Sequence, residues 1–348
     1  LLPATARRNY GLLLEKQKDL LQWSENSPHN PLSLTSEQGE PKAPLGIITN
    51  GLGLNYLEEN LPDMETIPVH LHISAYPLPV QKIRTLAATC ERILVVEEGY
   101  PVIEEKIAGI LPHSCRISGK LDGTLERTGE LTPDMVRRAL SLTAREERPA
   151  PAMEIPGRPP QLCKGCPHID TYLAITEAIA GDTEAVVTSD IGCYALGALP
   201  PYTAIETIVC MGASVGMAKG AAEAGVKRVV ATIGDSTFLH SGLTSLIDAA
   251  AANTPMTVVI LDNGTVGMTG GQETILPTSR VRRVIEGLEI DPAHIRTIIP
   301  LRKHAEENRR IIADELEHRG LSVVVAVREC LETLRKVPRT PSAVEVTA

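Results

Sequence analysis

Short apolar runs alternate with amphipathic stretches along most of this chain. In the clearest case, the β-branched run 229–233 is followed by an amphipathic stretch, 241–252, and a second apolar run, 257–261. Short apolar runs predict buried strands, and apolar positions at three- and four-residue spacing predict a helix. A strand, a helix and a strand without a hairpin signal predict a right-handed βαβ unit in a parallel sheet.

Polar residues follow both predicted strands of this unit. Gly234-Asp235-Ser236 ends the first strand, and Asp262-Asn263-Gly264 ends the second, just before a glycine-rich loop that reaches Gln272. Because ligands of parallel sheets bind at the carboxyl ends of strands, Asp235 and Asn263 are predicted to share one edge. Their oxygens suit magnesium, and the glycines admit phosphates close to the backbone. Each tripeptide taken alone is more simply explained as a turn.

The same alternation over the rest of the chain predicts an α/β protein with two parallel-sheet domains. The charged helical run 7–21 and the polar stretch 24–44 predict the tail of an upstream domain followed by a linker. Five prolines between 149 and 160 predict a stiff spacer. The predicted segments are a tail and linker, 1–44; a first domain, 45–148; a linker, 149–160; a second domain, 161–335, with peripheral stretches at 280–290 and 291–299; and a tail, 336–348.

Composition narrows the class of protein. The chain has 348 residues, of which 43% are hydrophobic and only 3% aromatic, so the cores must be aliphatic. A net charge of −9 without a basic cluster argues against a nucleic-acid partner. No apolar run is long enough to cross a membrane, and no secretory signal is visible. Seven cysteines in such a chain indicate a reducing, cytoplasmic location.

Four of the cysteines follow a pattern. Cys163 and Cys166 form a CxxC pair, and Cys193 and Cys330 each follow a predicted strand, at the edge expected for Asp235. The spacing leaves three interpretations open, namely unligated thiols, structural zinc and a [4Fe–4S] cluster, which needs four thiolates. The other three are predicted to be buried or neutral thiols: Cys90, Cys115 and Cys210.

Together these motifs resemble those of a known family. In the thiamine diphosphate motif, Gly-Asp-Gly precedes an asparagine by a similar distance, and here 26 residues separate Gly234-Asp235-Ser236 from Asn263. The loop 263–272 is similar to that of the 2-oxoacid:ferredoxin oxidoreductases. Gly-Ile-Ile-Thr-Asn-Gly, Tyr-Pro-Leu-Pro and Val-Val-Glu-Glu, in that order within 45–148, resemble the transketolase C-terminal-type domain of the indolepyruvate ferredoxin oxidoreductase α subunit.

The resemblance, which covers about 45–330, implies the cofactors thiamine diphosphate, Mg²⁺ and a [4Fe–4S] cluster. It assigns magnesium to Asp235, Asn263 and the carbonyl of Thr265, and the cluster to Cys163, Cys166, Cys193 and Cys330. The glycines and the serine expected to line the cofactor are Gly192, Gly212, Gly234, Ser236 and Gly267. His168, inside Cys-Pro-His, is expected to contact substrate, although a lone histidine is more often structural.

The implied activity is oxidative decarboxylation of a 2-oxoacid, indolepyruvate or another arylpyruvate, to acyl-coenzyme A. Electrons would pass through the cluster to ferredoxin. A partner subunit or upstream pyrimidine-binding domain would supply the activating glutamate, so this chain alone is expected to be incomplete for catalysis. Ser236 replaces the second glycine of the motif, Ile169 replaces an arginine that bears on arylpyruvate specificity, and no CxxCxxCxxxC run follows Cys330. Two alternatives are an iron-free thiamine-dependent decarboxylase or synthase and a non-catalytic nucleotide-binding subunit.

Overall fold

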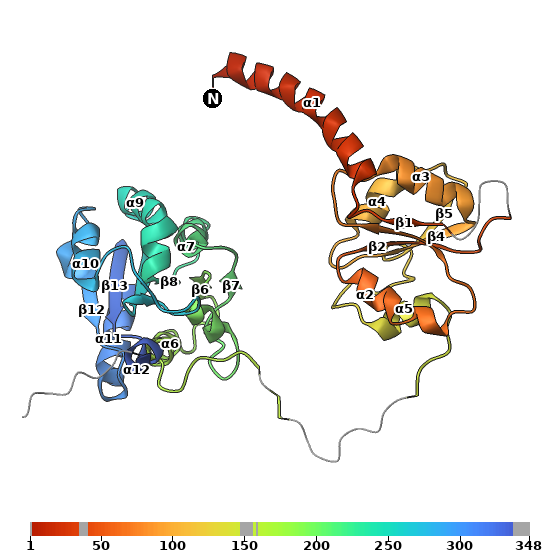
Figure 1. The fold of residues 1–348 in the computed structure, drawn as a ribbon. Coiled ribbons are helices and arrows are strands. Elements are labelled where there is room, and N and C mark those ends of the chain that lie inside the picture. The colour runs from red at the N-terminus through yellow and green to blue at the C-terminus, as the bar shows by residue number, and fades with distance from the viewer. Residues whose placement is uncertain (1, 35–40, 147–155, 158, 337–348) are drawn as a thin grey trace, which may run out of the picture. The chain divides into compact units, whose positions relative to one another are not determined.

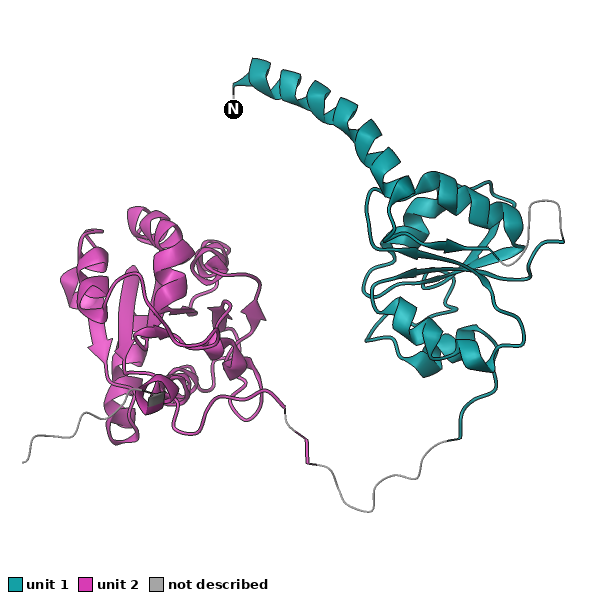
Figure 2. Ribbon diagram, viewed as in Figure 1, with its two compact units in different colours: residues 1–154 teal, residues 155–348 magenta. Residues whose placement is uncertain are grey.

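A computed structural model describes residues 2–34, 41–146, 156–157 and 159–336. It divides into two compact units, Leu1–Glu154 and Ile155–Ala348 (Figure 2). Each unit has its own largely parallel sheet flanked by helices, which confirms the predicted α/β class with two parallel-sheet domains. Most of the predicted linker 149–160 and nearly all of the predicted tail 336–348 lie outside the described residues, so the domain boundaries stay predictions.

The sheet of unit 1 has the strand order β1-β3-β2-β4-β5, in which only the pairing of β1 with β3 is antiparallel. Helices α3 and α4 cover one face, and α2 and α5 cover the other (Figure 1). The strands are β1 (Leu32–Ser33), β2 (Gly46–Asn50), β3 (Val69–Ile73), β4 (Arg92–Val96) and β5 (Arg116–Ser118). The helices are α2 (Gly53–Glu58), η1 (Leu61–Asp63), α3 (Val80–Thr89), α4 (Val102–Ala108) and α5 (Pro133–Ala139).

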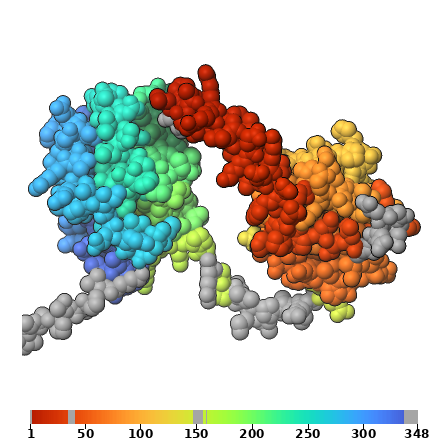
Figure 3. Space-filling view, turned by 45° about the horizontal axis from the view of Figure 1, so that its top comes forward, coloured from red at the N-terminus to blue at the C-terminus, as the bar shows by residue number. Residues whose placement is uncertain are grey.

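The segment predicted as tail and linker contains regular structure. Helix α1 (Pro3–Asn26) extends the predicted helical run in both directions, and its side chains are exposed over most of its length (Figure 3). At its end, Ser24 Oγ donates to the carbonyl of Ala75 at 3.1 Å, and Asn30 Nδ2 donates to the same carbonyl at 2.9 Å. Strand β1 then adds an antiparallel edge to the sheet. Part of the predicted polar linker is therefore anchored on unit 1.

Helix α5 is shorter than the predicted helix 132–145. The Thr132 hydroxyl caps its start by accepting from the amide of Met135 at 3.3 Å. Its end is followed by Ser141, whose φ of 60° is incompatible with a continuing helix.

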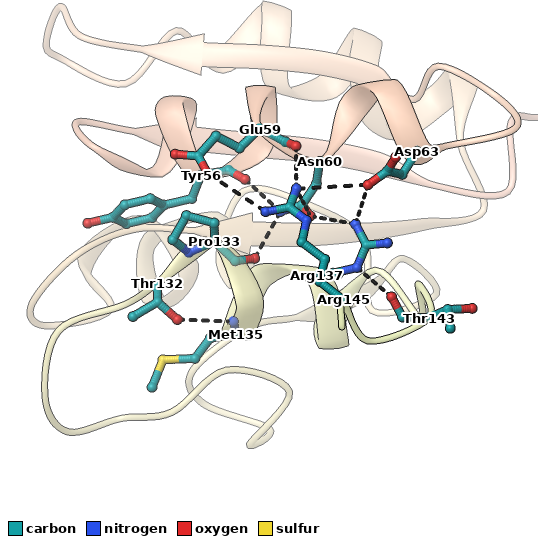
Figure 4. Close-up of polar contacts among 10 residues, drawn as sticks. All are labelled: Tyr56, Glu59, Asn60, Asp63, Thr132, Pro133, Met135, Arg137, Thr143 and Arg145. Atoms are coloured by element: carbon teal, nitrogen blue, oxygen red, sulfur yellow. Dashed lines mark hydrogen bonds and ion pairs between the residues drawn. The ribbon is translucent and has the colours of Figure 1, made fainter. Parts of the chain in front are cut away.

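A buried arginine links α5 to the segment 60–63, which contains η1 (Figure 4). Arg137 is 8% exposed, and its Nη1 donates to Asp63 Oδ2 at 2.6 Å and to Asn60 Oδ1 at 3.2 Å. Its Nε donates to the carbonyl of Thr143. Asn60 and Asp63 belong to the segment of η1, and Thr143 lies in the chain that follows α5. One guanidinium therefore links α5 to both of these segments.

Unit 2 contains a six-stranded sheet in the order β12-β13-β9-β8-β6-β7, with every pairing parallel. Helices α7, α9 and α10 pack on one face, and α6 and α11 pack on the other. The strands are β6 (Val186–Ser189), β7 (Thr207–Ile208), β8 (Val229–Gly234), β9 (Met256–Asp262), β12 (Ile295–Ile298) and β13 (Leu321–Val327). The helices are α6 (Pro167–Ala178), α7 (Ala213–Glu223), α9 (Leu243–Ala251), α10 (Thr278–Glu286), α11 (Ala305–Leu316) and α12 (Leu331–Lys336).

The predicted βαβ unit forms between β8 and β9. Its helical segment begins earlier than expected, because a short turn, α8 (Asp235–Thr237), and a π-helical turn, η3 (Phe238–Gly242), run directly into α9. The stretch 291–299, predicted as peripheral, supplies edge strand β12, where Ile298 is only 2% exposed. None of the helices in the described ranges is both long and apolar enough to cross a bilayer.

Candidate cofactor site

A cavity of about 150 Å³ opens at the carboxyl edge of the unit 2 sheet. The loops that follow β6, β8 and β9 form most of its wall. Met211, next to Gly212, also lines it. Of the residues predicted from sequence, those that line it are His168, Gly192, Cys193, Gly234, Asp235, Ser236, Asn263, Thr265 and Gly267; those that do not are Gly212, Cys163, Cys166 and Cys330.

Strand register explains why separated polar residues meet here. Gly234 of β8 is opposite Leu261 of β9, so the next residues, Asp235 and Asp262, are neighbours. Val327 of β13 is opposite Asp262 in turn. The chain beyond β13 stays beside the loop after β9, because the amide of Cys330 donates to the carbonyl of Asn263 at 3.1 Å.

Asp235 connects two of the loops. The carboxylate is 4% exposed and accepts from the amides of Ser236 at 2.6 Å and Gly264 at 2.8 Å. Gly264 has a φ of 71°, a left-handed conformation that favours glycine. Burial, and to a smaller degree the charge of Asp262, raises the pKa of Asp235 to about 7. A bound cation would offset this burial cost.

Asn263 is held by its own loop and faces α6. Its Oδ1 accepts from the amide of Thr265 at 3.1 Å, while Nδ2 lies 3.3 Å from Nε2 of His168. Thr265 Oγ1 donates to the carbonyl of Gln272 at 3.0 Å, which closes the glycine-rich loop. Two of the three predicted magnesium ligands, Asn263 and Thr265, are thus held on one loop by hydrogen bonds within that loop.

His168 lies in the first turn of α6 and is 3% exposed. Burial lowers the pKa of His168 to about 4, so the ring is neutral at neutral pH. A neutral ring that accepts from Asn263 at Nε2 carries its proton on Nδ1. The histidine therefore has a structural partner and also borders the cavity.

Three buried side-chain oxygens at this edge have no hydrogen-bond partner among the described residues: Ser189 Oγ, at the end of β6, Ser236 Oγ, in the cavity wall, and Asp262 Oδ2. The other carboxylate oxygen of Asp262 accepts from Thr278 Oγ1 at 2.8 Å. Buried polar atoms are nearly always paired, so unpaired ones at a cavity favour a polar ligand. The hydroxyl of Ser236 is well suited to bind a phosphate oxygen.

The glycines at this edge are required first by protein packing. A Cβ on Gly192 would lie 2.3 Å from the Tyr194 ring, and one on Gly234 would lie 2.5 Å from it. A Cβ on Gly212 would meet Ser241 Oγ at 2.4 Å. The motif suggests that these glycines allow a phosphate to approach the backbone. In the structure, neighbouring protein side chains already leave no room for a Cβ at these positions.

The four patterned cysteines are near neighbours. The position of a Cβ on Gly267 is 3.5 Å from Cys193 Sγ and 3.8 Å from Cys330 Sγ. Burial, and to a smaller degree the proximity of the other three thiols, raises the pKa of Cys166 to about 11. Cys163 is exposed and the rest are partly buried, and all four are free thiols.

No set of three or more His, Cys, Asp or Glu side chains within the described ranges converges tightly enough to hold one metal ion. A [4Fe–4S] cluster does not need such convergence, because each thiolate binds a different iron. Magnesium against a diphosphate needs only a few protein oxygens, and here an amide and a carbonyl accompany one carboxylate. By type of donor atom, the residues suit both groups.

Two buried residues of this edge were missed by sequence reasoning as site residues: Asp190 and Tyr194. Asp190 follows β6 as Asp235 follows β8, and that parallel was an available signal. It is fully buried and accepts from Ser214 Oγ at 2.7 Å, from the amide of Gly212 at 3.2 Å and from the Tyr194 hydroxyl. No local pattern marks Tyr194.

Comparison with known proteins agrees with this geometry. Residues 190–326 match the family described as thiamine pyrophosphate enzyme, C-terminal TPP binding domain. The match contains Asp235 and Asn263 but stops short of Cys330, and it begins after His168.

Curated relatives extend the similarity to both units. The indolepyruvate oxidoreductase subunit IorA of Methanothermobacter thermautotrophicus is 33% identical over 365 residues, covering 99% of this chain and 58% of the relative. That of Methanothermobacter marburgensis is 36% identical over 351 residues, covering 94% and 55%. This chain thus spans somewhat more than half the length of these relatives.

Among solved structures, a chain of 2-oxoglutarate:ferredoxin oxidoreductase from Magnetococcus marinus is 19% identical with a TM-score of 0.43, covering 54% of this chain and 74% of that one. In sequence, this chain resembles the archaeal indolepyruvate oxidoreductase subunits over nearly all its length, and its residues 190–326 match the C-terminal thiamine pyrophosphate-binding domain, which confirms the resemblance predicted from its motifs.

Proposed function

We propose that this chain supplies the diphosphate-binding half of the active site and the first electron acceptor of a thiamine diphosphate-dependent 2-oxoacid:ferredoxin oxidoreductase. One observation carries the proposal. Asp235, Asn263 and the four patterned cysteines come from five separate segments, and all lie at one edge of one sheet. Such an edge is where parallel sheets bind ligands.

The diphosphate end is held by the loops after β8 and β9. Asp235, Asn263 and the carbonyl of Thr265 would hold magnesium, and the unpaired hydroxyl of Ser236 would bind a diphosphate oxygen. Both oxygens of Asp235 already accept backbone amides, so the carboxylate is oriented before any ligand enters. That preorganisation reduces the ordering cost of binding.

Bound thiamine diphosphate supplies an electron sink for decarboxylation. His168, neutral and bordering the cavity, would present a ring nitrogen to substrate while Asn263 holds its orientation. A cavity of about 150 Å³ is small beside the roughly 300–1,000 Å³ of complete ligand sites. The remainder of the site is proposed to come from a pyrimidine-binding domain or partner subunit, which would also bring the activating glutamate.

The cluster is proposed to bind Cys163, Cys166, Cys193 and Cys330. A [4Fe–4S] cluster accepts one electron at a time. Gly267 lines the cavity, and a Cβ on it would lie 3.5 Å from the sulfur of Cys193 and 3.8 Å from that of Cys330. Cys193 lines the cavity as well, so the proposed cofactor and cluster sites would adjoin here.

The substrate is proposed to be a 2-oxoacid, with indolepyruvate or another arylpyruvate suggested by the relatives' names. Three exposed apolar side chains at the cavity wall, Ile191, Met211 and Met268, suit an aromatic group. Ile169, the departure from the family pattern, packs into the core and does not line the cavity. Coenzyme A and ferredoxin are the proposed acyl and electron acceptors, in a cytoplasmic enzyme.

Calorimetric titration of the full chain with thiamine diphosphate and Mg²⁺ tests the diphosphate half. Asp235→Ala is expected to weaken binding by about 10- to 100-fold, since it removes the only carboxylate among the proposed metal ligands. Asp248→Ala is the matched control, because that aspartate is exposed on α9. Absence of binding by the unmodified chain, or equal binding by both variants, would contradict the proposal and favour a non-catalytic subunit.

A further inference from the structure

One buried ring touches both the loop after β6 and the turn after β8. Tyr194 directly follows Cys193 and is 4% exposed. Its ring lies so close to Gly192 and Gly234 that neither position has room for a side chain. Gly234 precedes Asp235, the proposed magnesium ligand. The ring is therefore a spacer between a proposed cluster ligand and a proposed magnesium ligand.

The spacer is held at both of its ends. The Tyr194 hydroxyl donates to Asp190, which is fixed by Ser214 and the amide of Gly212 at the start of α7. The main-chain carbonyl of Tyr194 accepts from the hydroxyl of Tyr172 at 3.0 Å. With its tip and its backbone both anchored, the ring cannot shift without moving α6 or α7.

A third loop contacts the same ring through His168. The two rings meet edge to face with their centroids 6.1 Å apart and their planes at 84°. His168 in turn contacts Asn263. Tyr194 thus touches, directly or through one residue, the loops that carry Cys193, Asp235 and Asn263.

We propose that Tyr194 is a positioning residue whose ring sets the separation between the magnesium turn at Gly234-Asp235 and the cluster ligand Cys193. The inference rests on the proposed function, because it assigns a purpose to the distance between two proposed cofactors. Protein interiors are close-packed, so the thickness of a ring is transmitted to the backbone on both of its sides. Supporting residues of this kind change metal affinity by about 10- to 100-fold when altered.

Two substitutions separate the ring from its hydroxyl. Tyr194→Phe keeps the ring on both glycines and loses only the hydroxyl, with its contacts to Asp190 and to the carbonyl of Ile191. Tyr194→Leu removes the ring and lets the two loops approach each other. The leucine variant is expected to bind Mg²⁺ and thiamine diphosphate about 10- to 100-fold more weakly and to show a changed electron paramagnetic resonance spectrum of the reduced cluster. The phenylalanine variant is expected to resemble the unmodified chain in both respects.

Ile312 supplies the control for loss of core volume. It is fully buried on α11, in the same core as Tyr194, and does not line the cofactor cavity. Ile312→Ala therefore removes packing from this core while keeping the Tyr194 ring and both of its anchors. It is expected to lower stability while leaving cofactor affinity and the cluster spectrum unchanged.

Hydrogen exchange measured without cofactors completes the test. The amides of Ser236 and Gly264, both bonded to Asp235, are expected to lose slow exchange in Tyr194→Leu and to keep it in Tyr194→Phe and Ile312→Ala. Unchanged exchange, affinity and spectrum in a folded Tyr194→Leu variant would overturn the inference, as would equal defects in Tyr194→Leu and Ile312→Ala. If the unmodified chain binds neither cofactor, the proposed function fails, while the exchange comparison still decides whether Tyr194 holds this turn.

Discussion

At the scale of single residues, burial determines which polar groups are available for chemistry. Asp235 and Asn263 could be predicted from sequence because each directly follows an apolar strand, and strand ends of a parallel sheet meet at one edge. Tyr194 and Arg137 could not, because their roles depend on packing against segments far away in the chain. Gly192 and Gly234 lie at this edge as predicted. The structure shows the Tyr194 ring packed against both, and this contact cannot be inferred from the spacing of residues in the sequence.

A histidine in unit 1 makes stability depend on pH. His70 Nε2 lies 2.8 Å from Thr49 Oγ1, and burial, followed by the charge of His72, lowers the pKa of His70 to about 4. The unfolded chain binds a proton near pH 6.5 and the folded chain does not, so stability is complete above that pH and declines as pH falls toward 4. Between pH 7 and pH 5 the loss is expected to be about 1–2 kcal/mol.

Hydrogen exchange of the β2 and β3 amides, followed from pH 7 to pH 5, measures this loss. His70→Gln is expected to flatten the profile, because glutamine keeps a hydrogen-bonding group there without a titrating one. The exposed His113→Gln is the control and should leave the profile as it was. An unchanged slope in His70→Gln would show that His70 is not the source.

At the scale of helices and strands, the hydrophobic pattern predicted most of the elements but missed two strands at the edges of the sheets. The unit β8–α9–β9 formed as expected, and each end of its two strands lies within one residue of the predicted bounds. Edge strands β1 and β12 were missed, since an edge strand is short and half-exposed and lacks a strong apolar run. Helix α5 was predicted too long because the sequence beyond it stays helix-compatible until Ser141 reverses the chain.

The arginine that holds α5 is expected to contribute strongly to the stability of unit 1. Arg137→Met keeps much of the volume but leaves the Asp63 carboxylate, the Asn60 amide oxygen and the Thr143 carbonyl without this donor. The expected loss in free energy of unfolding is about 1–3 kcal/mol, measured by denaturant titration.

The neighbouring Arg138 offers a direct comparison. Its side chain is 62% exposed and pairs with an exposed Glu126. Surface pairs of this kind contribute little, so Arg138→Met is expected to change stability by less than about 1 kcal/mol. Equal losses in the two variants would mean that burial of Arg137 does not strengthen its contacts.

At the scale of the whole chain, the central claim is that one sheet edge brings a magnesium–diphosphate site and an iron–sulfur site together. The order β13-β9-β8-β6 makes this possible, because it sets Cys330, Asn263, Asp235 and Cys193 at the ends of four adjacent strands. Sequence spacing alone left zinc, unligated thiols and a cluster open, since spacing carries no information about strand order. The chain spans somewhat more than half the length of its curated relatives, so the complete reaction is a property of a larger assembly in this proposal.

Iron and acid-labile sulfide analysis of the chain purified without oxygen tests this claim most directly. We expect about four irons per chain, with brown absorbance near 400 nm, in the unmodified protein and in Cys210→Ser, whose exposed cysteine lies outside the set of four. Cys193→Ser is expected to lose most of the iron. Iron-free protein, or full iron retention in Cys193→Ser, would contradict the account and favour an iron-free thiamine-dependent enzyme.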